Sequence, residues 1–273
     1  MLDTAKAFGL DVVAITDHDS VSGIDEAIEY GKAIGIKVIP GIEITATSGY
    51  DIKSMEPHTR VDILCYRFDW HHPLLREMYE KLSILKTKWA KDVIRFLNGK
   101  GYQLDFNSLK GYSELFIIRQ LIERDYCKNR SEAKKIIRTK EILSKYPLVR
   151  PGLKEPIDLI LKIGGIPILA HAYFGPGRKA LSDQQVSELI QFLKGFGLMG
   201  VETHHYFHVE EQRYEKLLKI CKIQNLIPTI GSDHHSSKNT YNGITDDDKR
   251  VSVFSTINHD FNEIIELCLK DSD

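Results

Sequence analysis

The sequence lacks the features that mark several classes of protein. It has no run of about 18 apolar residues that could cross a membrane, and its first residues contain no apolar signal region. Its four cysteines form no CxxC pair, which argues against a zinc ribbon or a disulfide framework and fits a reducing compartment. A net charge of −1 creates no overall attraction to nucleic acid or anionic lipid. We therefore expect a cytoplasmic protein that binds no membrane, and we predict no stable protein partner.

Short apolar runs alternate with amphipathic helical patterns in the first and last parts of the chain. Strands are predicted near residues 12–15, 36–44, 61–66, 165–170, 199–203 and 227–230. Helices are predicted near 4–8, 23–34, 156–163, 184–196, 210–225 and 261–270. The apolar runs are continuous, as in strands that are covered on both faces of a parallel sheet. This order predicts an α/β fold.

The middle of the chain has a helical character throughout. Apolar residues recur every three or four positions from Leu74 to Phe96, which predicts one long amphipathic helix. Another helix is predicted near 113–124, and Ser131 is expected to cap a third. No strand pattern occurs between 74 and 146. We therefore predict a discontinuous barrel domain, residues 1–73 and 147–273, that carries an all-helical insertion, or lid, at residues 74–146.

Residues that commonly bind metals stand at the ends of the predicted strands. They are Asp17 and His18, Glu43, His171, Glu202 with His204 and His205, and Asp233 with His234 and His235. Because the carboxyl ends of parallel strands meet at one edge of a sheet, we expect these groups to share one cleft. A single histidine after a strand is more often structural. The combined set of imidazoles and carboxylates suits zinc, manganese or iron.

Five motifs carry a resemblance to a known family. They are Ile15-Thr16-Asp17-His18-Asp19, Pro40-Gly41-Ile42-Glu43, Leu169-Ala170-His171, Gly200-Val201-Glu202 and Gly231-Ser232-Asp233-His234-His235. In this order they resemble the polymerase and histidinol phosphatase (PHP) superfamily, and within it the phosphoesterases related to nucleoside 3′,5′-bisphosphate phosphatases. The resemblance spans almost the whole chain. It implies a distorted (β/α)7 barrel that holds up to three divalent ions, commonly manganese, iron or zinc.

The resemblance also implies roles for individual residues. Glu43 would bridge two ions, of which His171 would bind one and Asp233 another, while His18 and His235 would hold the third. These roles predict metal-assisted hydrolysis of a phosphate ester, in which the metal ions activate water as the nucleophile.

Other positions depart from the family pattern. Asp62 stands where the third strand usually carries histidine, although a carboxylate still suits these metals. Phe116 occupies a position in the insertion where a phosphate-facing histidine is usual. Asp17 is expected to orient a neighbouring ligand. The family's initial strand, which carries a His-x-His pair, is absent before Met1. We expect about 20 to 35 upstream codons, the length of one βα unit, to encode this strand. Without it, the chain is expected to have weak activity.

Four further residues are candidates for contacts with the substrate. His205 and His208 stand where the family places groups that contact phosphate or protonate the leaving oxygen, or else they belong to a surface loop. Arg178 could grip a second phosphate, since a guanidinium group binds phosphate through two hydrogen bonds. Arg119 could face the cleft from the insertion. Both arginines could equally be solvated surface charges.

The sequence therefore leaves two functions in competition. The first is a metal-dependent phosphoesterase that hydrolyses phosphate monoesters of a small nucleotide-like substrate, such as a nucleoside bisphosphate or the end of a short RNA. The second is a catalytically impaired PHP-fold protein that binds metal or nucleotide. An amidohydrolase is disfavoured because the usual lysine or additional histidine ligands have no counterpart here. No Gly-x-Ser-x-Gly, Walker or dinucleotide-binding motif indicates a different chemistry.

Overall fold

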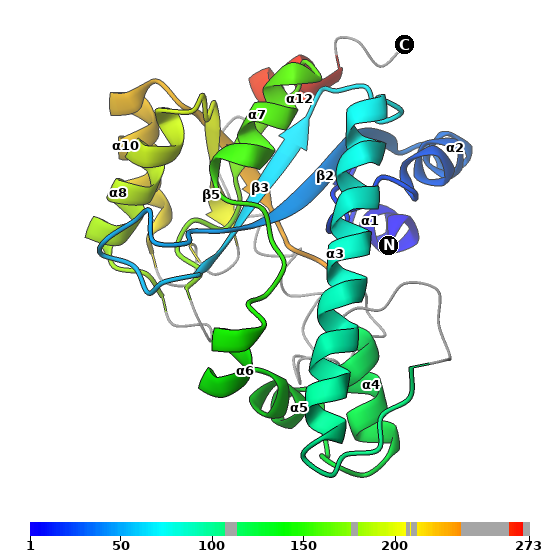
Figure 1. The fold of residues 1–273 in the computed structure, drawn as a ribbon. Helices are drawn as coiled ribbons and strands as arrows, with labels where there is room; N and C mark the ends of the chain where they lie inside the picture. The colour runs from blue at the N-terminus through cyan, green and yellow to red at the C-terminus, as the bar shows by residue number, and fades with distance from the viewer. Residues whose placement is uncertain (107–113, 176–179, 206–207, 209–211, 236–261, 270–273) are drawn as a thin grey trace. The chain divides into compact units, whose positions relative to one another are not determined.

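A computed structural model of the chain (Figure 1) describes residues 1–106, 114–175, 180–205, 208, 212–235 and 262–269. The chain divides into two compact units. Residues 1–74 and 151–273 form the first unit, and residues 75–150 form the second. No helix in the part of the chain that the structure describes is both long and apolar enough to cross a membrane.

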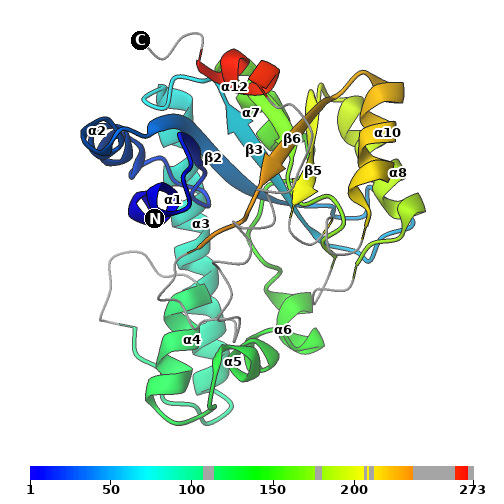
Figure 2. The same ribbon diagram turned by 180° about the vertical axis from the view of Figure 1, so that it is seen from behind.

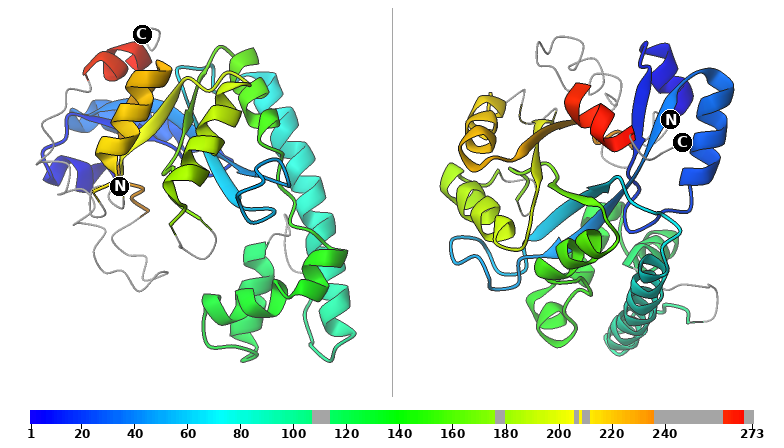
Figure 3. Two further views of the ribbon diagram at one scale, coloured as in Figure 1. Left: turned by 90° about the vertical axis from the view of Figure 1, so that its left-hand side faces the viewer. Right: turned by 90° about the horizontal axis from the view of Figure 1, so that it is seen from above.

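One β-sheet with both parallel and antiparallel strand pairs forms the centre of the first unit. Its strands are β1 (Val12–Ile15), β2 (Lys37–Thr47), β3 (Arg60–Tyr66), β4 (Ile166–Leu169), β5 (Gly200–His205) and β6 (Ile227–Gly231), and they lie side by side in sequence order. The sheet curls like half of a barrel, as the right-hand view of Figure 3 shows. The predicted α/β class is therefore confirmed.

Strand β3 runs against its neighbours. It pairs antiparallel with β2 and with β4, whereas the β1–β2, β4–β5 and β5–β6 pairs are parallel. The expectation of a parallel sheet is thus wrong for this strand. Its residues after Arg60 are buried on both faces, as in a parallel strand, so its continuous apolar run gives no sign of direction. The reversal brings the start of β3 to the edge where β2 and β4 end.

Helices cover the sheet of the first unit (Figure 2). They are α1 (Leu2–Ala7), α2 (Ile24–Ile34), α7 (Lys154–Lys162), α8 (Asp183–Lys194), α10 (Tyr214–Gln224) and α12 (Asn262–Leu269). Helix α2 packs on β2, α7 packs on β3 and β4, and α10 packs on β5 and β6. Ile39, Leu64 and Ile168 of the sheet belong to one buried cluster with Ile264 and Cys268 of α12. Burial of such side chains fixes the strands whose ends carry the candidate ligands.

The second unit is helical, with α3 (Pro73–Asn98), α4 (Glu114–Glu123), α5 (Arg130–Ile137) and α6 (Lys140–Lys145). Helix α3 begins at the boundary between the units and extends through the second one. Trp89, Val93, Phe116 and Ile137 belong to its buried core. Phe116 therefore serves as a packing residue of this unit.

The start of α5 differs from the sequence prediction. The helix begins at Arg130, and Asn129 is its N-cap, because the Asn129 side chain accepts a hydrogen bond from the backbone N–H of Glu132 at 3.0 Å. The Glu132 carboxylate in turn accepts from the backbone N–H of Lys128 at 2.8 Å. Ser131 lies inside the helix. Asparagine and serine are comparable N-caps, so residue preference alone does not decide between Ser131 and Asn129, two positions before it.

Candidate metal centre

The turn after β1 places His18 beside Glu43. The backbone N–H of Glu43 donates to the carbonyl oxygen of Asp17 at 3.2 Å, and the N–H of Asp19 donates to the carbonyl oxygen of Glu43 at 2.9 Å. The Asp19 carboxylate accepts from the N–H of Thr45 at 3.0 Å. These bonds prolong the β1–β2 pairing past the end of β1. As a result His18 Nδ1 lies 3.0 Å from Glu43 Oε2.

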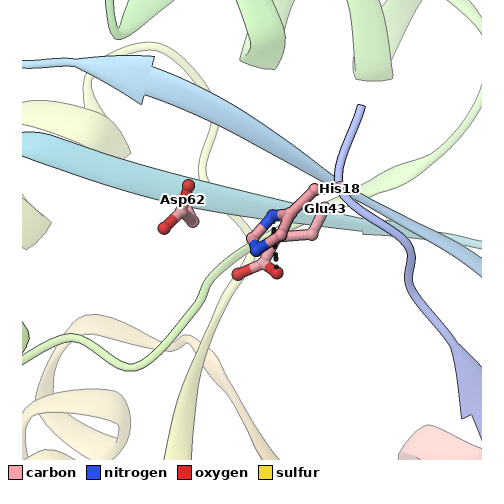
Figure 4. A group of neighbouring side chains, drawn as sticks. All are labelled: His18, Glu43 and Asp62. Carbon is pink, nitrogen blue, oxygen red and sulfur yellow. Dashed lines mark ion pairs between the residues drawn. The ribbon is translucent and has the colours of Figure 1, made fainter. Parts of the chain in front are cut away.

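Asp62 joins this pair because of the direction of β3. It is the third residue of β3, pairs with Thr45 of β2, and accepts a backbone hydrogen bond from Ala170 at 3.0 Å. Each of His18, Glu43 and Asp62 offers one ligand atom, and these three atoms lie within 4.8 Å of one another. Figure 4 shows the three side chains, with the ion pair between His18 and Glu43 marked.

His171 approaches the same carboxylates from the end of β4. Its Nε2 lies 3.0 Å from Glu43 Oε1 and 3.4 Å from Asp62 Oδ2. Its backbone φ is 27°, an uncommon value for a residue with a side chain. The backbone N–H of His171 donates to Glu202 Oε2 at 2.8 Å, which helps to hold this conformation. The two oxygens of Glu43 thus face two different histidines, the arrangement that a bridging carboxylate requires.

An irregularity in β5 lets two residues of that strand contribute. The register between β5 and β6 shifts between Glu202 and His204, which is a β-bulge. In a regular strand, residues three apart point to opposite faces. Here Glu202 contacts the backbone of His171, and the His205 ring lies 5.8 Å from the His171 ring. His204, between them, packs against Tyr214 of α10 instead.

The segment after β6 supplies the remaining ligand candidates. Asp233 has a φ of 51°, and its Oδ2 lies 3.9 Å from Nε2 of the buried His205. His235 Nδ1 lies 3.4 Å from Asp233 Oδ1 and 2.8 Å from the Asp233 carbonyl oxygen. The His18 and His235 rings are 6.0 Å apart. His18, Glu43, Asp62, His171, Asp233 and His235 are therefore linked by short contacts at one edge of the sheet.

The electrostatics of this edge indicate an excess of negative charge. Burial alone would lower the pKa of His171, but the hydrogen bond to Glu43 and the charges of Glu43, Asp62 and Glu202 raise it to about 10. Burial raises the pKa of Glu202 to about 7. Burial would also raise the pKa of Asp233, yet the neighbouring histidines His205, His171 and His235 hold that pKa well below its usual value. Buried carboxylates so close together need positive charge beside them, which His171 and Arg60 supply in the metal-free protein and which bound divalent ions could also supply.

A cavity opens beside these residues. Its volume is about 320 Å³, and its polar wall includes Asp17, His18, Glu43, His171, Glu202, Asp233 and His235. Leu10, Val12 and Ile230 are among the apolar residues on its other sides. The volume lies at the lower end of the range for small-molecule sites.

The other predicted site residues are placed differently. Asp17 is exposed and lines the cavity, and it has no hydrogen bond from its side chain to a candidate ligand among the described residues. His205 lies inside β5 and is buried, so it does not belong to a surface loop. Arg119 is exposed on α4 of the second unit. Arg178 lies outside the described residues.

His208 is buried and held by the backbone. The backbone N–H of Tyr173 donates to His208 Nε2 at 3.3 Å, and His208 Nδ1 lies 3.1 Å from the carbonyl oxygen of Thr203. One ring nitrogen therefore accepts and the other donates, which is the pattern of a neutral imidazole. Burial and the charge of His205 hold the pKa of His208 well below its usual value. His208 thus connects the segment after β4 to β5.

Two residues of the centre have no role of their own in the sequence prediction. Arg60, the first residue of β3, lies against Asp62 and His18. Glu202 was included among the strand-end residues and in a motif but was given no individual role, although it receives the N–H of His171. The signal for Glu202 was present, because a glutamate inside an apolar strand is seldom buried without a partner. The signal for Arg60 was not, since a charge that precedes a strand is usually solvated.

Comparisons with known proteins agree with this geometry. Residues 1–270 match the PHP domain. A 5′-3′ exoribonuclease of Haemophilus influenzae is 26% identical over 86% of this chain and 83% of the relative. A 3′,5′-nucleoside bisphosphate phosphatase of Chromobacterium violaceum is 24% identical over 86% of this chain and 81% of the relative. A solved structure from Bifidobacterium adolescentis, described as a metal-dependent phosphoesterase, superposes with a TM-score of 0.67 at 27% identity and covers 96% of this chain and 91% of its own. The family resemblance of the sequence motifs is thus confirmed, and the chain belongs to the PHP domain family.

Proposed function

We propose that this chain hydrolyses phosphate monoesters of a small nucleotide-like substrate, either a nucleoside bisphosphate or the end of a short oligonucleotide. Its family and its relatives make it a metal-dependent phosphoric ester hydrolase. The observation that carries the proposal is the meeting of Glu43, Asp62, His171 and Asp233 at one edge of the sheet, where Glu43, His171 and Asp233 also line the cavity. The sequence separates these four residues by up to 190 positions.

The residues of the centre fit divalent metal ions. Glu43, Asp62 and Glu202 are buried carboxylates, and isolated buried charges of one sign are strongly unfavourable. The donor set of imidazole nitrogens and carboxylate oxygens suits manganese, iron or zinc. Bound divalent ions lower the pKa of water and neutralise charge on phosphoryl oxygens.

We assign the roles of the protein groups as follows. Glu43 holds two positions together, because one of its oxygens faces His18 and the other faces His171. Asp233 and His235 act together as metal ligands after the end of β6. Glu202 fixes the backbone of His171 and so its ring direction. In this scheme each ligand is held by a hydrogen bond or by strand pairing.

His205 is the better candidate for proton transfer to the leaving oxygen. It is buried beside Asp233 at 3.9 Å, and a neighbouring carboxylate stabilises the protonated imidazole that such a transfer needs. His208 has both ring nitrogens engaged with the backbone, so its role in this proposal is to hold β5 and the segment after β4 together. Arg119 and Arg178 remain candidates for contact with the substrate, and Asp17, which was expected to orient a ligand, lies on the cavity wall.

The helical second unit is proposed to act as the lid of the site. The nucleotide-like substrate is inferred from two of the relatives, which are named for action on RNA and on nucleoside bisphosphates. The complete fold is proposed to be the distorted (β/α)7 barrel of the family.

Phosphate release from a panel of substrates tests the proposal. Purified protein is loaded with Mn²⁺, Fe²⁺ or Zn²⁺ and incubated with nucleoside 3′,5′-bisphosphates, mononucleotides and short RNAs. We expect release from at least one of them, and loss of at least about 100-fold in Glu43→Gln, because a directly ligating group matters more than its supports. His58→Asn is a matched control, since His58 is exposed and its φ of 60° suits asparagine. Protein that binds metal but releases no phosphate from any substrate would favour the binding-protein alternative.

A further inference from the structure

An arginine contacts two of the three residues, His18, Glu43 and Asp62, whose candidate ligand atoms lie close together. Arg60 Nε lies 2.9 Å from Oδ1 and 2.6 Å from Oδ2 of Asp62. Arg60 Nη2 lies 3.1 Å and 3.4 Å from the two ring nitrogens of His18. These two similar distances place the guanidinium against the imidazole ring, and not in line with one nitrogen lone pair.

The strand geometry makes this contact a fixed feature. Arg60 and Asp62 are two residues apart in β3, so their side chains point to the same face. Asp62 is buried and Arg60 is partly exposed. Arginine stays protonated throughout the usual pH range, so the guanidinium is a permanent positive charge at this corner of the centre.

We propose that Arg60 acts as a built-in monovalent cation that excludes a divalent ion from the corner between His18 and Asp62. This inference rests on the proposed metal centre. Arg60 already neutralises the Asp62 carboxylate, and a divalent ion bound by His18 and Asp62 would stand within a few ångströms of the guanidinium. Like charges at that separation repel strongly in a partly buried site.

The remaining ligands are not blocked in this way. Glu43 Oε1 with His171, and Asp233 with His205 and His235, make their contacts without Arg60. The chain should therefore bind fewer divalent ions than its number of donor groups would allow. Arg60 would set the number of ions, and it would keep Asp62 ionised and in place.

Metal titration of arginine variants tests this inference without any assay of turnover. Metal-free wild-type protein and the variants Arg60→Gln and Arg60→Lys are titrated with Mn²⁺ by calorimetry, and the metal content is measured after dialysis. Arg60→Gln keeps a hydrogen-bond donor for Asp62 but removes the charge. We expect it to bind one more ion per chain than the wild type does. Arg60→Lys keeps the charge and should bind as many ions as the wild type.

Three outcomes separate the possibilities. Equal stoichiometry and affinity in the wild type and Arg60→Gln would overturn the role of Arg60 while leaving the metal centre intact. A wild type that binds no divalent ion would instead overturn the proposed metal centre. If Arg60→Gln weakens the binding of inorganic phosphate, measured by calorimetry, at unchanged metal content, Arg60 binds the substrate phosphate and the inference is wrong. Should Arg60→Gln fail to fold, as judged by circular dichroism, Arg60→Met supplies the same comparison.

Discussion

Binding of a divalent ion at His171 should release a proton from the protein at neutral and mildly alkaline pH. In the metal-free protein the His171 pKa is raised to about 10, because the Glu43 hydrogen bond and the surrounding carboxylates outweigh the effect of burial. A metal ligand must be a neutral imidazole, so the ion has to displace this proton. At about pH 8 the pKa lies about two units above the solution pH, which keeps His171 almost fully protonated. We therefore expect release of about one proton for each ion bound at this position.

Calorimetric titration with Mn²⁺ at about pH 8 measures this release. The apparent enthalpy in two buffers of different ionisation enthalpy gives the number of protons. Glu202 adds little at that pH, because its pKa is about 7 and it is already mostly ionised. Metal affinity should rise about tenfold per pH unit until the pH approaches 10. His171→Asn should abolish the release, whereas His58→Asn should leave it unchanged. Enthalpies that do not depend on the buffer would show that His171 is neutral before the metal binds.

The same proton has a consequence for stability. The His171 pKa is higher in the folded protein than the usual value of 6.5, so folding is favoured by protonation. This contribution is complete below about pH 6.5 and is lost as the pH rises through about 10. Urea unfolding of the metal-free protein should therefore show falling stability across this interval. A flat profile over that range would contradict the raised pKa.

Two further substitutions test the packing of the centre and of the helical unit. In Gly231→Ala the new Cβ would lie 1.8 Å from Glu202 Oε1, so the Glu202 carboxylate must leave the N–H of His171. We therefore expect a loss of about 1 to 3 kcal/mol in unfolding free energy and weaker Mn²⁺ binding. Gly152→Ala is the control, since its Cβ meets its nearest neighbour at 3.8 Å, and equal effects of the two changes would refute the clash. Asn129→Ala should lower the unfolding free energy by about 1 kcal/mol, because α5 loses its N-cap, whereas Ser131→Ala should change it little. A larger loss in Ser131→Ala than in Asn129→Ala, measured by urea unfolding, would show that Ser131 is the N-cap.

The sequence carried enough information to place most of the centre. Short apolar runs show where strands end, and the residues that follow parallel strands meet because these strands end at the same edge of the sheet. His18, His171 and Asp233 were found in this way. Their short contacts require details that no periodicity contains, such as the positive φ of His171 and Asp233 and the Asp19 side chain that holds the turn after β1.

Local irregularities account for what the sequence did not reveal. His205 could be read as a loop residue because the apolar run ends at Val201, yet β5 continues to His205. The bulge in β5 resets the alternation of side chains, so a pattern of period two misplaces every residue after it. It is this shift that brings both Glu202 and His205 toward His171. A single sequence gives no sign of a bulge, since the extra residue changes pairing and not composition.

The direction of β3 determines more of the chemistry than any one residue of the strand. If β3 ran parallel to β2, its start would lie at the far edge of the sheet, and the groups near the ligands would be Cys65 and Tyr66. Because β3 is antiparallel, Asp62 reaches Glu43 and His171, and Arg60 accompanies it two residues earlier on the same face. The Asp62 carboxylate and the Arg60 guanidinium that neutralises it therefore lie side by side. A second carboxylate can be tolerated next to Glu43 because the same strand supplies the positive charge of Arg60 beside it. The number of metal ions in the centre then depends on both Asp62 and Arg60.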